Sequence, residues 1–110
     1  QGLVLLAPSA PEGVDLIVLS HSSDAFLDIP EGPALILAGH GHCGQVTIPF
    51  FGRPILPLAH PRYACHLTEE NGKILFVSAG IGTSILPVRF LNPPEIVLIT
   101  LRGAQESAAA

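Results

Sequence analysis

Residues 34–45 have the sequence ALILAGHGHCGQ, in which an apolar run leads directly into a loop rich in glycine and histidine. The apolar part, 34–38, predicts a strand, and the glycines that follow predict a loop at its carboxyl end. His40 and His42 stand one residue apart in this loop, and strand ends of this kind are where sites in α/β folds usually form. Imidazole is the commonest neutral metal ligand, so the loop is a candidate metal site.

A second strand is predicted upstream, and it also ends in a histidine. Residues 14–20 are almost continuously apolar and include β-branched side chains, which is typical of a parallel strand covered on both faces. His21 follows this run directly. Ser22 then begins a segment with helix N-cap chemistry, and a short helix is expected over 24–28, before Pro30 stops it. Strand, helix and strand form a βαβ unit, with both histidine motifs at the carboxyl ends of its strands.

The second half of the chain predicts antiparallel β structure. Asn71-Gly72 lies between two strand-like runs, 63–68 and 73–78, and this dipeptide is the strongest short-range hairpin signal. A last strand is expected over 95–101, and residues 105–110 are expected to be a disordered tail.

Composition limits the classes of protein to consider. The 110 residues allow at most one domain, and only 13% are charged, against about 25% in typical soluble domains. The net charge of -4 argues against a nucleic-acid partner, which would need a basic surface. With 48% hydrophobic residues and no apolar run near the roughly 20 residues of a membrane span, the chain is expected to present an apolar face to another subunit or to a missing part of the protein.

The ends of the chain and its cysteines add two further expectations. The chain begins at Gln1 and contains no Met, so it is interpreted as a fragment. Cys43 and Cys65 show neither CxxC spacing nor the density of a disulfide scaffold, and they leave the redox compartment open. Cys43 is interpreted as a small packed residue beside the histidines rather than a ligand for a soft metal. His60 and His66 have no supporting motif and are assigned to the surface.

Several segments together resemble the C-terminal half of a calcineurin-like metallophosphoesterase of the bacterial YkuE-like branch. They are LSHSSD at 19–24, GHGHCGQ at 39–45, VSAGIGT at 77–83 and the PVRF and PPEI motifs at 87–90 and 93–96. The resemblance extends over about 14–101. It implies an α/β fold in which residues 1–110 are the C-terminal portion of one metallophosphoesterase domain, a β-sandwich flanked by helices in four αββα layers.

The resemblance also implies roles for individual residues. His21 and His40 would bind the second of two divalent metal ions, and His42 would bind the first. The ions would be Mn, Fe, Zn or Co, and would hydrolyse a phosphoester with a hydroxide held between them. In extended backbone, residues two apart point the same way, so His40 and His42 would each face one ion. Arg89 and Gly41 are weaker candidates for substrate binding, and no catalytic residue is identified beyond the metal ligands.

The motifs that the family carries in its first half are absent. No Asp-x-His, Gly-Asp or Gly-Asn-His motif occurs in the chain, and three neutral imidazoles cannot balance two dications. The parent protein is therefore expected to be the hydrolase, and this chain alone is expected to be inactive without the N-terminal half as its partner. The substrate would be a phosphorylated small molecule or a lipid-linked phosphate, as a monoester, diester or pyrophosphate.

Other expectations concern assembly and place in the cell. Nucleic acid is not an expected partner, a homo-oligomer is a further candidate assembly, and the location would be the bacterial cytoplasm or a membrane surface. Two alternative functions remain open: a non-catalytic scaffold that uses the same fold to bind partners, and a stand-alone zinc module with three histidine ligands. The metal content separates the three hypotheses: two ions per assembled site, none, or one.

Overall fold

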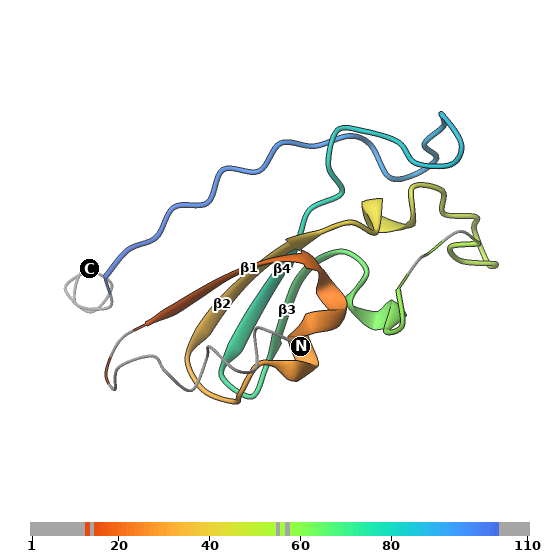
Figure 1. The fold of residues 1–110 in the computed structure, drawn as a ribbon. Coiled ribbons are helices and arrows are strands. Elements are labelled where there is room, and N and C mark those ends of the chain that lie inside the picture. The colour runs from red at the N-terminus through yellow and green to blue at the C-terminus, as the bar shows by residue number, and fades with distance from the viewer. Residues whose placement is uncertain (1–12, 14, 55, 57, 104–110) are drawn as a thin grey trace.

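The described part of the chain, in a computed structural model, comprises residues 13, 15–54, 56 and 58–103 and is built on one four-stranded sheet (Figure 1). The strand order is β1-β2-β4-β3. Three short 3-10 helices accompany the sheet, so the fold is a mixed α/β arrangement with little helix. The elements in chain order are β1 (Leu16–Ser22), η2 (Ser23–Asp28), β2 (Ala34–Gly39), η3 (His42–Gly44), η4 (Pro61–Tyr63), β3 (His66–Glu70) and β4 (Lys73–Val77).

The predicted strand-helix-strand unit is confirmed. β1 and β2 pair in parallel, with Leu16 opposite Ala34, and η2 connects them. The Ser22 side chain caps η2 by accepting a hydrogen bond from the Asp24 amide at 3.2 Å. This unit brings the carboxyl ends of β1 and β2 to the same edge of the sheet, which is where the histidines lie.

The predicted hairpin is also confirmed, but the second half of the chain is not purely antiparallel. Asn71 and Gly72 have φ angles of 54° and 80°, which the two-residue turn between β3 and β4 requires. β3 begins only at His66, because the residues before it form η4 and a short bend. β4 pairs in parallel with β2, so the hairpin extends the sheet that the first half of the chain begins.

The hydrophobic core lies on one face of the sheet only. Side chains from β1, β2 and β4 meet side chains from η2, from the residue after it, and from η4. This is the side of the sheet on which the helices lie in Figure 1. The members of this cluster are Val18, Phe26, Ile29, Ile36, Tyr63, Leu75 and Val77. The rings of Phe26 and Tyr63 meet edge to face, with their centroids 5.0 Å apart.

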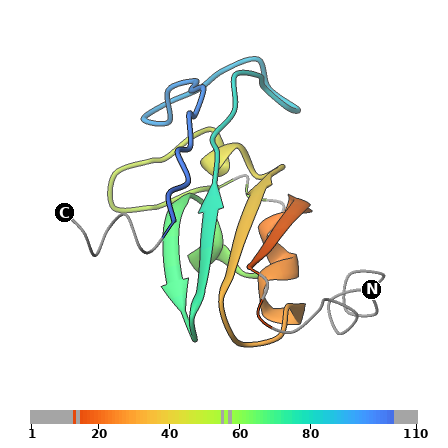
Figure 2. The ribbon, with the colours of Figure 1, turned by 90° about the vertical axis from the view of Figure 1, so that its left-hand side faces the viewer.

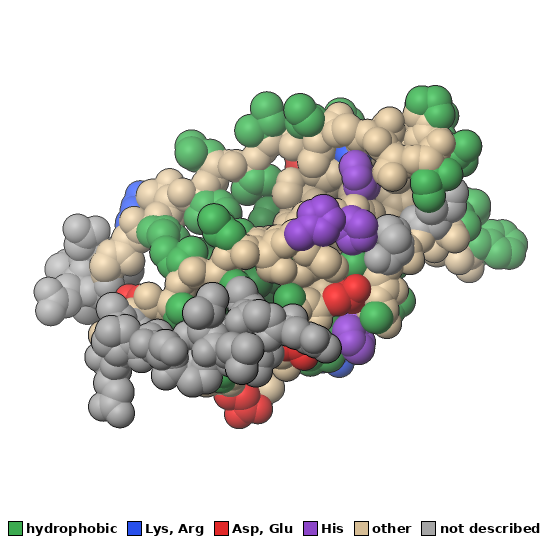
Figure 3. All heavy atoms as spheres, viewed as in Figure 1, with side chains coloured by type: hydrophobic (Ala, Val, Ile, Leu, Met, Phe, Trp, Pro, Cys, Tyr) green, Lys and Arg blue, Asp and Glu red, His purple; other side chains and the backbone are tan. Residues whose placement is uncertain are grey.

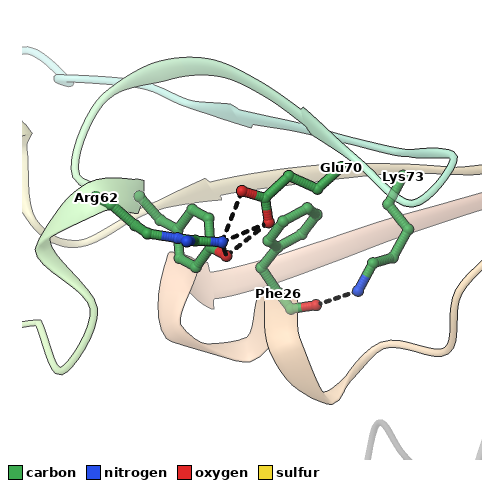
Figure 4. Close-up of polar contacts among 5 residues, drawn as sticks. Phe26, Arg62, Glu70 and Lys73 are labelled. Carbon is green, nitrogen blue, oxygen red and sulfur yellow. Dashed lines mark hydrogen bonds and ion pairs between the residues drawn. The ribbon is translucent and has the colours of Figure 1, made fainter.

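Two sets of polar contacts border this core, one made by Lys73 and the other by Arg62, Tyr63 and Glu70 (Figure 4). The buried Lys73 ammonium donates to the carbonyl oxygens of Phe26 and Ile29, at 2.8 and 2.7 Å, at the end of η2. The Tyr63 hydroxyl donates to Glu70 at 2.7 Å, and Arg62 donates to both oxygens of the same carboxylate. The hydrogen bond to Tyr63 and the charge of Glu70 raise the pKa of Arg62 above its ordinary value.

The opposite face of the sheet is exposed, which corrects the expectation that the first strand is covered on both faces. Ile17 and Leu19 on β1 are 52% and 75% exposed. The predicted strand over 95–101 is also wrong for this chain. That segment runs as an extended, unpaired stretch over the exposed side of the sheet (Figures 1 and 2). Its apolar pattern is that of a strand, but no strand in the described residues pairs with it.

The end of the chain and a possible membrane span remain to be considered. The expected tail at 105–110 lies outside the described residues. None of the helices that the structure describes has the length and hydrophobicity needed to cross a membrane.

Candidate metal centre

The three histidines singled out in the sequence lie together at the carboxyl edge of the sheet. His21 is near the end of β1, His40 follows β2 directly, and His42 begins η3. All three line one cavity of about 240 Å³. Histidine side chains gather visibly on this face of the molecule (Figure 3). The βαβ topology therefore brings together side chains that are up to 21 residues apart in the chain.

His21 and His40 are direct neighbours. Their ring centroids are 4.5 Å apart, with the ring planes tilted by 43°. Both side chains are exposed on the cavity side, so ring nitrogens remain open to a ligand. The two imidazoles thus come to one place because they lie at the carboxyl ends of adjacent parallel strands.

His42 is held by a backbone carbonyl. Its Nδ1 lies 3.2 Å from the carbonyl oxygen of Gly82, in the Gly-rich loop that the sequence placed near the site. With the proton on Nδ1, this nitrogen donates to the carbonyl and Nε2 is left with a free lone pair. Metal-ligating histidines almost always donate their other ring N–H in this way, because the bond fixes the tautomer and the ring orientation. His42 therefore fits the role of a metal ligand.

The loop that carries His40 and His42 is not extended. The expectation that the two side chains point the same way because they lie two residues apart in extended backbone is therefore wrong. The backbone turns through left-handed conformations, which are uncommon outside glycine. The φ angles are 69° at His40, 51° at His42, 52° at Cys43, 80° at Gly44 and 60° at Gln45. Both histidines nevertheless line the same cavity. Backbone of this kind persists only where surrounding contacts hold it, and it concentrates at functional sites.

One of these contacts is covalent and was missed from the sequence. Cys43, which is fully buried, forms a disulfide with Cys65. The expectation of a small packed residue is correct for its burial but incomplete for its chemistry. The spacing gave no signal, since the two cysteines are 22 residues apart and meet only when β3 folds beside the loop. The Arg53 Nε also donates to the Cys43 carbonyl oxygen, at 2.8 Å.

Gln45 is a further residue whose role the sequence did not reveal. Its side chain is buried and donates to the carbonyl oxygens of Leu86 and Ser84, at 2.6 and 3.2 Å. Its Oε1 accepts from the Ser84 amide at 2.7 Å. The three bonds clamp the loop at 84–86 against the histidine loop and so form one wall of the cavity. A glutamine directly after a Gly-rich loop was the available signal.

The two weaker candidates lie in different places. Gly41 lines the cavity, between the two histidines. Arg89 donates to the backbone carbonyls of Ala79, Gly82 and Asn92, at distances between 2.6 and 3.0 Å. Its Nη2 is 3.4 Å from His42 Nδ1, beside the shared Gly82 carbonyl. Arg89 thus holds the loop that orients His42, and its contact with substrate remains a prediction.

The donor set contains only imidazole. No carboxylate lines the cavity among the residues described, and the Asp24 carboxylate instead accepts the amides of Ala59 and His60. Within the same residues, one group of three or more candidate ligands has all its ligand atoms within 4.8 Å of one another: Cys43, Cys65 and His66. The three cavity histidines therefore do not converge on one ion by themselves, which does not favour the zinc module with three histidine ligands. The imidazoles fit a metal centre whose oxygen ligands come from elsewhere.

Curated bacterial proteins align with most of this chain. The metallophosphoesterase YkuE of Bacillus subtilis is 38% identical over 88 residues, which are 79% of this chain. A metallophosphoesterase of Aquifex aeolicus is 33% identical over 80% of the chain, and the phosphodiesterase YaeI of Escherichia coli is 28% identical over 86%. The chain is a homologue of these metallophosphoesterases. No family model and no solved structure shows significant similarity to it.

The metallophosphoesterase homologue matches only a C-terminal part of its relatives. It spans about a third of their length, 31% of YkuE and 35% of YaeI, rather than the half expected from the sequence. The greater part of each relative thus lies outside the match. This agrees with a donor set that is incomplete within the described residues of the chain.

Proposed function

We propose that this chain supplies the imidazole ligands of a two-metal centre that hydrolyses a phosphoester, and that the rest of the protein supplies the oxygen ligands. The observation that carries the proposal is the placement of His42. Its Nδ1 lies 3.2 Å from the Gly82 carbonyl oxygen, which leaves Nε2 with a lone pair when Nδ1 carries the proton, and its side chain lines the same cavity as the paired rings of His21 and His40. The names of the relatives support the same class of reaction.

Each residue of the centre has a distinct task. His21 and His40 would bind one ion together, and His42 would bind the other through Nε2. Arg89 and Gly82 keep the His42 ring in one orientation. When bound, divalent ions would polarise the phosphoryl oxygens and lower the pKa of the attacking water. The metals would be Mn, Fe, Zn or Co, because mixed imidazole and carboxylate sites accept all of them.

The cavity also suggests where the rest of the substrate would lie. Val46, Ile85 and Leu86 are the large apolar side chains that line it. An apolar wall beside a metal centre would accommodate the organic part of a phosphoester while the imidazoles face the phosphoryl group. We therefore expect a diester to be a better substrate than inorganic pyrophosphate, which has no group to place against this wall.

The missing ligands would come from an N-terminal portion that packs on the exposed face of the sheet. Ile17 and Leu19 line this face, and the unpaired segment at 95–101 lies over the same side, with Ile96 and Leu98 89% and 93% exposed. Apolar surface of this extent is unusual on a free domain. A second sheet that pairs with this segment would complete the β-sandwich and its helical layers.

Metal analysis and hydrolysis assays of the intact protein that contains this chain test the proposal. We expect two ions per site by elemental analysis, and Mn²⁺-dependent hydrolysis of bis-p-nitrophenyl phosphate. The His42→Ala variant should lose at least about 100-fold in kcat/KM, because loss of a metal ligand removes several kcal/mol of transition-state stabilisation. The matched control is His60→Ala, since His60 is exposed and does not line the cavity.

The same experiment addresses the second hypothesis. A non-catalytic scaffold would bind no metal and would show no hydrolysis above a metal-only control. If the intact protein is metal-free and inactive although it folds, the catalytic proposal is wrong and the scaffold hypothesis takes its place.

A further inference from the structure

We propose that the disulfide between Cys43 and Cys65 is a redox-sensitive tether that sets the metal affinity of the histidine loop. Reduction would release the loop at 39–45 and weaken metal binding, and oxidation would restore it. The inference rests on the proposed function, because it concerns the same candidate ligands. It concerns a control of that site rather than its reaction.

The bond lies directly beside the candidate ligands. Cys43 follows His42 within η3, and Cys65 immediately precedes β3. The disulfide therefore fastens the histidine loop to the start of an edge strand of the sheet. The two Cα atoms are 4.8 Å apart, and the link encloses a sequence separation of 22 residues.

The loop needs such a fastening because its backbone is unfavourable. His40, His42, Cys43 and Gln45 all have φ angles between 51° and 69°, a region that costs non-glycine residues free energy. The non-covalent contacts that hold the loop reach mainly its second half, through Gln45 and the Arg53 bond to the Cys43 carbonyl. Opening the disulfide would leave the His42 ring with the Gly82 carbonyl and its neighbour Arg89, and the His42 backbone with the hydrogen bond that its carbonyl oxygen accepts from the Gln45 amide.

The disulfide is also within reach of a reagent. Cys65 is half-buried, and both cysteines line a cavity of about 90 Å³ that His66 and Glu95 border. A small thiolate would attack the Cys65 sulfur, break the S–S bond and release Cys43 as a thiolate, which takes up a proton. A second thiol would then attack the mixed disulfide. In balance, two small thiols are oxidised to one disulfide and the protein gains two thiols.

Thermodynamic linkage makes the proposal quantitative. If the closed disulfide raises the affinity for a metal by some factor, the bound metal must stabilise the disulfide against reduction by the same factor. Couplings of this kind are usually about 5- to 150-fold. A bond that merely stabilises the fold far from the site would show no coupling in either direction.

The experiment uses the intact protein in glutathione buffers of graded composition. Alkylation and mass spectrometry measure the fraction of Cys43 and Cys65 that is reduced, with and without Mn²⁺. Mn²⁺ affinity is measured separately for the oxidised and the reduced protein. Deuterium exchange at residues 39–46 is followed in metal-free protein in both states, so that the tether is tested independently of metal. The control is the Cys43→Ala, Cys65→Ala double variant.

We expect reduction to speed exchange in the loop about tenfold or more and to weaken Mn²⁺ binding by a factor within the usual coupling range. Mn²⁺ should shift the reduction equilibrium by an equal factor. The double variant should resemble the reduced protein and should not respond to glutathione.

Several results would overturn the proposal. Equal Mn²⁺ affinity in the two redox states overturns the tether alone, whereas a protein that binds no Mn²⁺ in either state overturns the proposed function as well. If Cys43 and Cys65 stay oxidised in the folded protein at millimolar glutathione, the disulfide is not redox-sensitive and the proposal is wrong. If the reduced protein instead captures Zn²⁺ and loses it in His66→Ala, the cysteines and His66 form a metal site and not a tether.

Discussion

Lys73 shows how much a single buried residue can decide in a small core. The residue is 4% exposed, and its ammonium lies 4.5 Å from the centroid of the Phe26 ring and donates to two carbonyl oxygens at the end of η2. A sequence pattern cannot reveal this role, because the lysine occupies an ordinary first position of a predicted strand. The partners become visible only when η2 packs on β4.

Replacing this lysine with a residue of similar size should therefore destabilise the fold. In Lys73→Met the carbonyl oxygens of Phe26 and Ile29 lose their donor while they remain buried. Hydrogen bonds to charged groups contribute about 1.5 to 3 kcal/mol, so we expect a loss of that size in the free energy of unfolding of the intact protein in urea. Asp28→Asn, at an exposed position of η2, should change it by less than about 0.5 kcal/mol. Equal effects in the two variants would contradict this role.

Gln45 allows a sharper test, because its side-chain nitrogen donates hydrogen bonds while its side-chain oxygen accepts one. Gln45→Glu keeps the oxygen that accepts from the Ser84 amide but turns the other end into an oxygen that faces two carbonyls. We expect it to be at least as destabilising as Gln45→Ala, with each losing about 1 to 3 kcal/mol. Urea unfolding measures the loss, and faster deuterium exchange at 82–88 should accompany it. A stable Gln45→Glu variant would show that the clamp is not needed.

At the scale of elements, the sequence predicted most of the turns, caps and strands that depend on neighbouring residues. The Asn71-Gly72 turn, the short helix after the segment with N-cap chemistry, and the two strands with a histidine at or just past their carboxyl ends are all confirmed, because neighbouring residues determine them. The prediction over 95–101 was wrong because strand pairing depends on a distant partner, and none is present among the described residues. The disulfide was missed for the same reason, since its two cysteines meet only in the folded sheet.

The hairpin turn is the element whose geometry is most demanding. Gly72 has a φ of 80°, and a Cβ built there would lie 3.3 Å from the backbone carbon of Gly32. Gly72→Ala should cost about 1 to 2 kcal/mol of unfolding free energy because of the left-handed conformation, with the close approach adding to it. Gly103→Ala, where a Cβ meets open space, is the control and should be neutral. A thermal unfolding midpoint that is unchanged in Gly72→Ala would refute the turn assignment.

At the scale of the whole molecule, one face of the sheet is covered by the hydrophobic core and the other face is exposed. The core packs beneath the strands, while Leu19, Leu67 and Leu98 are 75%, 65% and 93% exposed. The high hydrophobic content predicted an apolar face of this kind, and the comparison with longer relatives agrees with it. The candidate metal centre is proposed to be completed in the same way, because among the residues described the cavity is lined by imidazoles and by no carboxylate.

A substitution on the exposed face of the sheet should therefore lower the free energy of unfolding only in the intact protein. Leu98→Asp should leave the secondary structure of the 110-residue chain unchanged, since Leu98 touches little there. In the intact protein it should cost about 1.5 to 3 kcal/mol, the value of one fully buried leucine. Unfolding in urea measures the loss, with Asp28→Asn at an exposed position as the control. If Leu98→Asp is harmless in the intact protein, this face is not covered by the N-terminal portion.

The position of β1 at the rim of the sheet has a practical consequence for anyone who produces this chain alone. Within the described part of the chain, no strand pairs with its outer backbone amides and carbonyls, and its residues from Leu16 to Ser20 carry no charge to discourage one. An edge of this kind is a template for strand addition, and the apolar segment at 95–101 is the right length to be added. We expect isolated molecules to join edge to edge into insoluble fibrils, unless the N-terminal portion proposed above is supplied during folding.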